Sequence, residues 1–264
     1  MSITIGSLFA GIGGFELGLE RAIPGAQTIW QVEQNEYCQR ILKKHWPHAQ
    51  LFDDVCEVGA HNLPPVDILC GGFPCQDIST IGKGEGLNGK KSGLWFQMFR
   101  IICELRPRIV IMENVSAILV RGLPRILGDL AGIGYDCEWQ IISASQFGAL
   151  HQRKRWFAVA YPTSTQAGRL ELSRMEKTRR KTRPNTRSHR NQIARDLRGD
   201  GFWKEGTTEP PFYFLDYGIS NRLAGLTALG NSIVPQCSQW IGEQVLASGL
   251  IDEIIQSNHS EASK

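Results

Sequence analysis

The chain has 264 residues, of which 42% are hydrophobic and 21% charged, with a formal net charge of +3; this length allows one large domain or one large and one small. No apolar run reaches the roughly 18 residues that span a bilayer, and "MSITIGSLFAGIGG" lacks the basic region and cleavage site of a signal peptide, so we expect a cytoplasmic protein. The seven cysteines form no CxxC pair and no zinc-like His/Cys cluster, which predicts reduced thiols and no metal site.

The first 160 residues alternate short apolar runs with helix-like stretches. The apolar runs are "ITIGSLF", "QTIWQV", "VDILC" and "PRIVIM". This alternation predicts an α/β fold with a doubly wound, mostly parallel sheet. Ligands bind outside the carboxyl ends of the strands in such sheets. The residues that fall at these ends are Gly11, Glu33, Asp54, Cys75 and Glu113.

The first strand leads into a glycine-rich turn, "SLFAGIGGFELGLE". Such a turn can aim backbone N–H groups and a helix N-terminus at a ligand. Glu16 stands where a dinucleotide fingerprint has its third glycine, and we expect its charge to repel a pyrophosphate. Glu33, twenty residues after Gly13, is placed to accept hydrogen bonds from both ribose hydroxyls. The pair favours an adenosine cofactor without phosphates, such as S-adenosylmethionine; the alternative is a glycine turn with a structural role only.

Cys75 follows a proline in "GGFPCQDIS", in a loop after the predicted strand "VDILC". Cys70 ends that strand and is predicted to be a buried apolar residue, the usual environment of a free cysteine. Cys75 lies near the start of a predicted helix, where the local field can lower a thiol pKa. The residues alone leave two interpretations of Cys75, a packed thiol or a nucleophile.

Glu113 ends the predicted strand "RIVIM" beside apolar residues. Burial there would raise its pKa, as a general acid requires, and a structural ion pair is the alternative. "HQRKRWFAVAY" places Arg153 and Arg155 two apart on a predicted strand, and hence on one face. The two arginines could neutralise carboxylates or hold an anionic or carbonyl-bearing substrate.

The sequence changes character after Tyr161. Residues 163–199 contain eleven Lys and Arg against three Asp and Glu, a net charge of +8, which indicates either contact with a polyanion or a solvated surface. We therefore expect a catalytic and cofactor-binding domain over 1–162, a small basic recognition region over 163–227, and a C-terminal segment over 228–264. In that segment "SIVPQCSQWIGEQVLASGLIDEII" predicts one helix that packs on the N-terminal sheet through Ile241, Val245 and Leu246.

Five motifs, "LFAGIGG", "GGFPCQDIS", "MENV", "HQRKRWF" and "ALGNSIVPQ", occur in this order. Their order resembles that of the cytosine carbon-5 DNA methyltransferases, over residues 3–161 and about 217–245. His151 stands where that family usually has Gln at the start of the arginine motif. The 163–227 region is shorter than the usual DNA-reading region, and its phosphate contacts would not give sequence specificity.

The resemblance implies a reaction in which a thiolate adds to carbon 6 of cytosine, so that carbon 5 can attack a methyl group. Cys75 would then be the nucleophile and Glu113 the group that hydrogen bonds or protonates ring N3. Arg155 would bind the O2 atom of the ring, and Arg153 would support the loop or a phosphate. The target base would have to be flipped out of the duplex.

The resemblance also implies binding sites for cofactor and DNA. Phe9 would contact adenine, Glu33 the ribose and Asp54 the adenine amino group of S-adenosylmethionine, which becomes S-adenosylhomocysteine. The predicted cofactor residues are Phe9, Ala10, Gly11, Gly13, Gly14, Glu33, Asp54, Pro74, Asn231 and Ser232. The loop 76–93, with five glycines and three lysines, would close on DNA phosphates. Its predicted DNA-contacting residues are Gln76, Ser79, Lys83, Lys90 and Lys91.

Double-stranded DNA is thus the expected partner of a monomeric enzyme, with a companion restriction endonuclease as a further candidate partner. Two other interpretations stay open. A structured RNA could replace DNA as the substrate, or the chain could bind DNA without catalysis. Retention of Cys75, Glu113 and the glycine-rich turn favours an active enzyme over the second of these.

Overall fold

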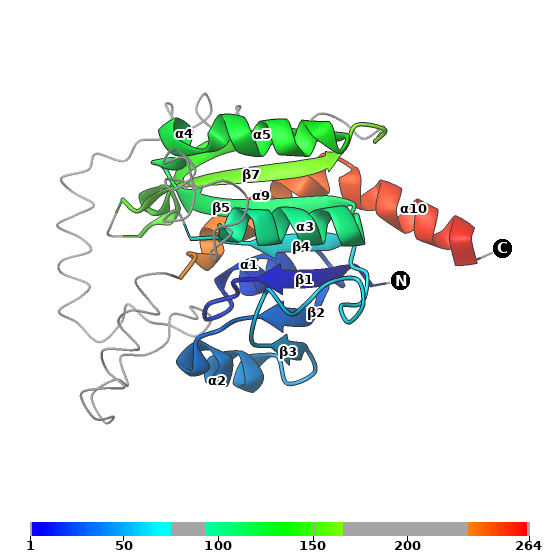
Figure 1. Ribbon diagram of the computed structural model, residues 1–264, viewed down its shortest axis with the longest axis horizontal. Coiled ribbons are helices and arrows are strands. Elements are labelled where there is room, and N and C mark those ends of the chain that lie inside the picture. Colours follow the sequence, from blue (N-terminus) through cyan, green and yellow to red (C-terminus); the bar gives the residue numbers. More distant parts are fainter. Residues whose placement is uncertain (1, 75–92, 150–151, 166–231, 263–264) are drawn as a thin grey trace. The chain divides into compact units, whose positions relative to one another are not determined.

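A computed structural model (Figure 1) describes residues 2–74, 93–149, 152–165 and 232–262, which lie within one unit of the chain. The sheet has seven strands in the order β3-β2-β1-β4-β5-β7-β6. The strands are β1 (Thr4–Leu8), β2 (Gln27–Val32), β3 (Gln50–Phe52), β4 (Ile68–Gly71), β5 (Ile109–Val115), β6 (Tyr135–Ser143) and β7 (Lys154–Pro162). The helices are α1 (Gly14–Ala22), α2 (Glu36–His45), α3 (Leu94–Leu105), α4 (Ile118–Arg121), α5 (Leu123–Gly132), the 3₁₀ helix η3 (Ala144–Phe147), α9 (Pro235–Ala247) and α10 (Leu250–Ala262).

The first five strands pair in parallel, and β7 inserts antiparallel between β5 and β6. The order runs outward from β1 in both directions, so the doubly wound, mostly parallel sheet that the alternation predicts is confirmed. Because β1 to β5 are parallel, their carboxyl ends lie at one edge of the sheet.

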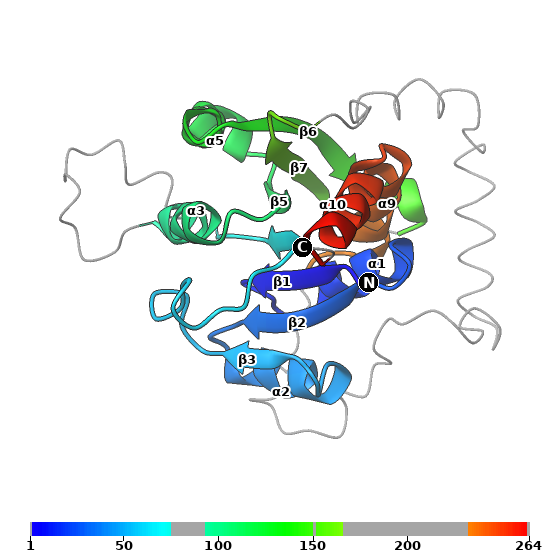
Figure 2. The same ribbon diagram turned by 90° about the vertical axis from the view of Figure 1, so that its right-hand side faces the viewer.

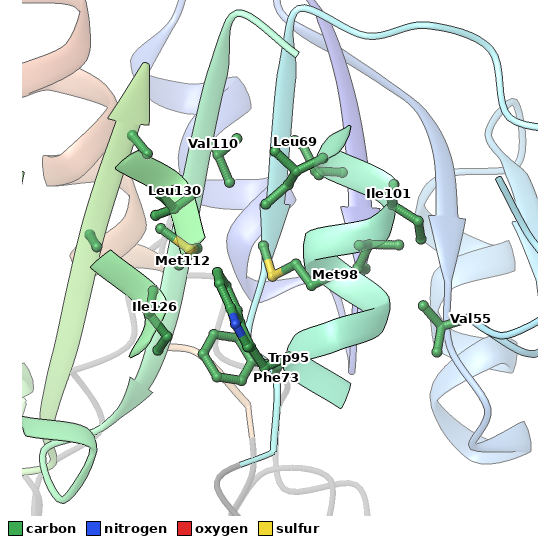
Figure 3. Packing of buried hydrophobic residues seen from close by; sticks show 14 of the residues in the cluster. Val55, Leu69, Phe73, Trp95, Met98, Ile101, Val110, Met112, Ile126 and Leu130 are labelled. Atoms are coloured by element: carbon green, nitrogen blue, oxygen red, sulfur yellow. The ribbon is translucent and has the colours of Figure 1, made fainter. Parts of the chain in front are cut away.

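Helices cover both faces of the sheet, with α3 and α5 on one face and α1, α9 and α10 on the other (Figure 2). Neighbouring residues of a buried strand therefore enter different cores. Leu69 packs into the first core, together with Trp95 and Met98 of α3 (Figure 3). Ile68 and Cys70 pack into the second. Burial on both faces explains why the central strands are continuously apolar rather than alternating.

Two helical stretches of the chain are interrupted. The C-terminal one, predicted as a single helix, is divided into α9 and α10 at Ser248 and Gly249, where Gly249 has φ 82°. The stretch after β5 is divided into α4 and α5 at Gly122. Of the three residues predicted to pack on the core, Ile241 and Val245 are buried and Leu246 is partly buried, which confirms the packed face.

Helix α9 packs closely on α1 because both helices present small residues at the contact. A Cβ atom on Gly18 would lie 2.0 Å from Ser238 Oγ, and one on Gly242 would lie 2.6 Å from Ala22 Cβ. The Ser238 hydroxyl donates a hydrogen bond of 2.8 Å to the carbonyl of Gly14. This contact brings the residues just before α9 next to the glycine-rich turn. None of the described helices is long and apolar enough to span a bilayer.

Candidate functional site

The carboxyl edge of the parallel strands gathers the residues that the sequence predicts for a cofactor. The glycine-rich turn follows β1, Glu33 follows β2, and Asp54 lies just after β3. These strands are neighbours in the sheet, so residues far apart in sequence reach one edge. Four of the five positions predicted to share this edge are described, and the fifth, Cys75, lies outside the described residues.

Glu33 is fixed in place by backbone donors on both carboxylate oxygens. Gly11 N–H donates to Oε2 at 2.7 Å, and Asn35 N–H donates to Oε1 at 2.8 Å. Each carboxylate oxygen can accept more than one hydrogen bond, and the side chain is only partly buried. Glu33 can therefore accept further hydrogen bonds from a pair of ligand hydroxyls.

The turn before α1 has a backbone that suits close approach to a ligand. Phe9, Gly11 and Gly13 have positive φ angles of 55°, 59° and 89°, and Phe9 is only partly buried. A Cβ on Gly11 would meet no atom within 4 Å, whereas one on Gly13 would lie 2.2 Å from the Trp46 ring. Gly13 is thus required by packing, and Gly11 borders open space that a ligand can occupy. Asp54 Oδ1 accepts from Cys56 N–H at 2.8 Å and is partly exposed.

The role expected for Glu16 is wrong. Glu16 was expected to face the ligand and repel phosphates, but its side chain is completely buried. Its Oε1 atom accepts a hydrogen bond of 3.1 Å from Gln31 Nε2, and burial raises its pKa to about 7. The side chain at this helix position turns into the protein, so it supplies no charge to the ligand face.

Glu113 lies within β5 rather than at its end, because the strand continues to Val115. Its side chain is 8% exposed, and its Oε1 atom lies 2.9 Å from Arg155 Nε. Phe157 pairs with Glu113 and Arg155 with Val115 across β5 and β7, so the acid and the arginine are diagonal neighbours on one face. Burial raises the pKa of Glu113 to about 7 despite the opposing effects of Arg155 and Arg153, so the carboxyl keeps its proton to a higher pH than an exposed glutamate does.

Arg153 comes just before β7, not on the strand as predicted, and has a φ of 26°. It nevertheless lines one small pocket with Glu113 and Arg155. Its guanidinium donates to the carbonyl of Ser232 at 2.5 Å, and burial lowers its pKa. Arg153 therefore joins the Glu113 pocket to the segment that leads into α9.

The residues just before Cys75 are anchored beside Glu113. Asn114, the next residue along β5, donates from Nδ2 to the carbonyl of Phe73 at 2.7 Å. The Phe73 ring packs on Trp95 with a centroid distance of 5.4 Å (Figure 3). The described chain continues from there to Pro74, which is exposed. These contacts fix the point from which the chain leads to Cys75.

Three residues of the site were not singled out from the sequence. A Cβ on Gly72 would lie 3.0 Å from Glu113 Oε2 and 3.2 Å from Ile233 Cδ1, and the carbonyl of Ile233 would lie 2.2 Å from a Cβ on Gly14. Ile233 thus touches both the glycine-rich turn and the Glu113 pocket, and Cys237 lines that pocket too. The motif "GGFPC" includes Gly72 and "GNSIVPQ" includes Ile233, whereas Cys237 follows the second motif by one residue. Only the folded chain shows the contacts of these residues.

Several predicted site residues lie outside the described residues, so their roles stay predictions. They are Cys75, Gln76, Ser79, Lys83, Lys90, Lys91 and Asn231. Residues 166–231, which include most of the predicted recognition region, lie outside as well.

Residues 3–209 match the family model of the C-5 cytosine-specific DNA methylases. Among curated proteins, the type II methyltransferase M.CviJI of Paramecium bursaria Chlorella virus IL3A is 37% identical over 163 residues, 61% of this chain and 43% of that protein. The type II methyltransferase M.HhaI of Haemophilus parahaemolyticus is 30% identical over 158 residues, 58% of this chain and 47% of that protein. This chain thus spans about half the length of these relatives.

Solved structures agree on the fold. A putative DNA modification methyltransferase from an Escherichia coli prophage is 26% identical, with a TM-score of 0.53 over 64% of this chain and 49% of that one. The Schizosaccharomyces pombe Dnmt2 methyltransferase is 19% identical, with a TM-score of 0.57 over 66% of this chain and 55% of that one.

Proposed function

Because the chain belongs to the C-5 cytosine-specific DNA methylase family, we propose that it transfers the methyl group of S-adenosylmethionine to carbon 5 of cytosine in double-stranded DNA. The observation that supports this best is the pocket in which a buried Glu113, with its pKa raised to about 7, meets Arg155 and Arg153. A carboxyl that keeps its proton near neutral pH can donate to a ring nitrogen, and a neighbouring guanidinium can bind a ring carbonyl.

The cofactor site is proposed at the edge formed by the glycine-rich turn, Glu33 and Asp54. The residues present fit an adenosine group, since Glu33 is pre-oriented by two N–H groups and Gly11 borders open space. Phe9 would contact adenine, Asp54 its amino group and Glu33 the ribose. When bound, S-adenosylmethionine would supply an electrophilic methyl group.

In the proposed reaction, the Cys75 thiolate forms a bond to carbon 6 of a flipped cytosine. Electron density then builds at N3 and carbon 5, and protonated Glu113 stabilises it by donating to N3. Arg155 binds O2, and Arg153 holds the Ser232 segment against the pocket. After carbon 5 gains the methyl group, its proton passes to solvent and the bond from carbon 6 to the Cys75 sulfur breaks, which releases the thiolate. The N3 proton returns to Glu113, and the aromatic ring is restored.

Duplex DNA is the proposed macromolecular partner. The loop 76–93 and the basic segment 163–199 would contact DNA phosphates. A companion restriction endonuclease, a cytoplasmic location and a monomeric state remain predictions from the sequence.

Labelled methyl transfer tests the proposed function. The protein is incubated with radiolabelled S-adenosylmethionine and a mixed-sequence DNA duplex, with transfer RNA as a competing substrate. We expect label on carbon 5 of cytosine in the DNA. Folded protein that binds the cofactor but labels only the RNA, or neither nucleic acid, would contradict the proposal.

Glu33→Gln is expected to weaken binding of S-adenosylmethionine by about 10- to 100-fold, because hydrogen bonds to a charged acceptor contribute roughly 1.5–3 kcal/mol. The neutral amide keeps the size of the side chain but offers one oxygen acceptor instead of two. Titration calorimetry measures the change, with Glu36→Gln, an exposed acid of the next helix, as the control. Equal affinities of Glu33→Gln and wild type would rule out the ribose assignment.

Gly72→Ala is expected to slow methyl transfer by about 10- to 100-fold while the protein stays folded, because displacement of a reacting group by a fraction of an ångström to 1 Å has effects of this size. The new Cβ would lie 3.0 Å from Glu113 Oε2, so the acid must move. Gly128→Ala is the matched control, because a Cβ there meets no atom within 4 Å. Single-turnover rates of the two variants should differ; similar rates would show that the position of Glu113 is not critical.

A further inference from the structure

The buried acid of α1, Glu16, lies between the two parts of the proposed cofactor site. It occupies the first turn of α1, three residues after Gly13. Its Oε1 atom accepts from Gln31 of β2, two residues before Glu33. Both Glu16 and Gln31 are inaccessible to solvent, at 0% and 1% exposure. Glu16 thus connects the helix that follows the glycine-rich turn to β2, the strand that leads to Glu33.

The second oxygen of Glu16 lies next to a serine hydroxyl. Among the described residues, Glu16 Oε2 and Ser7 Oγ are both buried without a hydrogen-bond partner. Ser7, on β1, is near enough to lower the pKa of Glu16. A buried carboxylate oxygen without a donor is costly. A proton on Oε2 would turn it into a donor, and the Ser7 hydroxyl is an available acceptor.

The groups that face Glu16 do not supply a positive charge. Glu20, on the same helix, raises the pKa of Glu16 by repulsion, as burial does more strongly. Cys70, on β4, has its own pKa raised by burial and by Glu16. Glu20 is itself bound by Thr28 N–H at 2.9 Å and by Trp46 Nε1 at 3.0 Å. Ser7 and Gln31 are the neutral neighbours from β1 and β2.

We propose that Glu16 is a positioning residue for the cofactor site, and that it acts as an uncharged carboxylic acid that joins α1 to β2. The inference rests on the proposed use of S-adenosylmethionine. Ionisation of Glu16 places an uncompensated charge in a solvent-free site next to Glu20 and Cys70. The ionised state therefore favours separation of α1 from β2, which would change the spacing between the glycine-rich turn and Glu33.

The consequence is a proton-linked cofactor affinity. If only protein with a protonated Glu16 binds S-adenosylmethionine, the apparent affinity falls in proportion to the protonated fraction of Glu16. That fraction is about one tenth at one pH unit above the pKa, so affinity is about tenfold weaker there than at low pH. Glutamine is neutral at every pH and has the same size, so Glu16→Gln removes the dependence. An alanine at position 16 cannot accept the hydrogen bond from Gln31, so Glu16→Ala loses the contact between α1 and β2 at every pH.

Calorimetric titration with S-adenosylmethionine between pH 6 and 8 tests the positioning role. We expect wild-type affinity to fall about tenfold over this range, Glu16→Gln to stay level, and Glu16→Ala to bind weakly throughout. Glu36→Gln, an exposed first-turn acid of α2, should follow wild type. If the affinities of wild type and Glu16→Gln depend on pH in the same way, the role proposed for Glu16 is overturned while the proposed function is not. A failure of wild type to bind at any pH would instead overturn the proposed function.

Thermal unfolding without cofactor tests the neutral state of Glu16. A carboxyl with a folded pKa near 7 and an unfolded value near 4.5 destabilises the fold progressively as pH rises from 4.5 to 7. Glu113 has a similar shift, but it is present in both proteins and cancels in the comparison. The wild-type midpoint should therefore fall relative to that of Glu16→Gln between pH 5 and 8. A constant difference between them would show that Glu16 is ionised throughout.

Discussion

Replacement of Glu113 by glutamine is expected to lower the rate of methyl transfer by about two to four orders of magnitude, the usual contribution of a general acid. The amide has the size of the acid and can hydrogen bond, but it cannot give a proton to ring N3. Glu113 is suited to that task because burial among β4, β5 and β7 keeps its pKa near 7 beside two arginines. Single-turnover rates with saturating DNA and cofactor measure the loss.

The same variant separates the acid role from the structural alternative by its pH profile. In wild type the protonated fraction of Glu113 falls as pH rises through 7, so the chemical rate should fall with it. The rate of the glutamine variant should not fall as pH rises through 7. Circular dichroism should show that the variant is folded. If the variant's rate is within about tenfold of the wild-type rate and still falls as pH rises through 7, the result would favour a purely structural ion pair between Glu113 and Arg155.

Replacement of Cys75 by serine is expected to reduce turnover by roughly three orders of magnitude or more, or about 4 kcal/mol of transition-state stabilisation. A serine hydroxyl is almost fully protonated at neutral pH and is a much weaker nucleophile than a thiolate. Cys56→Ser and Cys103→Ser are the matched controls, because both thiols are free and exposed. They should keep wild-type rates, and a Cys75→Ser protein that did the same would exclude covalent catalysis by this residue.

The sheet and the edge that holds the site could be predicted because both depend on local patterns. Continuous apolar runs such as "PRIVIM" form strands buried on two faces, and parallel pairing brings Gly11, Glu33 and Asp54 to one edge. Burial of Cys70 follows from the same rule. The resemblance in motif order agrees with the family match.

The parts that could not be predicted depend on contacts between distant segments. The sequence alone gives Gly72 no special role. In the fold, a Cβ atom added to Gly72 would lie 3.0 Å from Glu113 Oε2. Glu16 has a position in the sequence that suggests a ligand-facing charge, yet the direction of its side chain follows from packing of α1 on β1 and β2. The strand that contains Glu113 extends further than its apolar run because β7 pairs with it up to Val115.

A covalent trapping experiment tests the central claim most directly. Duplex DNA containing 5-fluorocytosine is incubated with S-adenosylmethionine and either wild-type protein or Cys75→Ser, since fluorine at carbon 5 cannot leave as a proton does. We predict that wild type forms a denaturation-resistant complex, that peptide mass spectrometry finds the base on Cys75, and that Cys75→Ser forms none. An adduct on another residue, or equal trapping by the two proteins, would contradict the account.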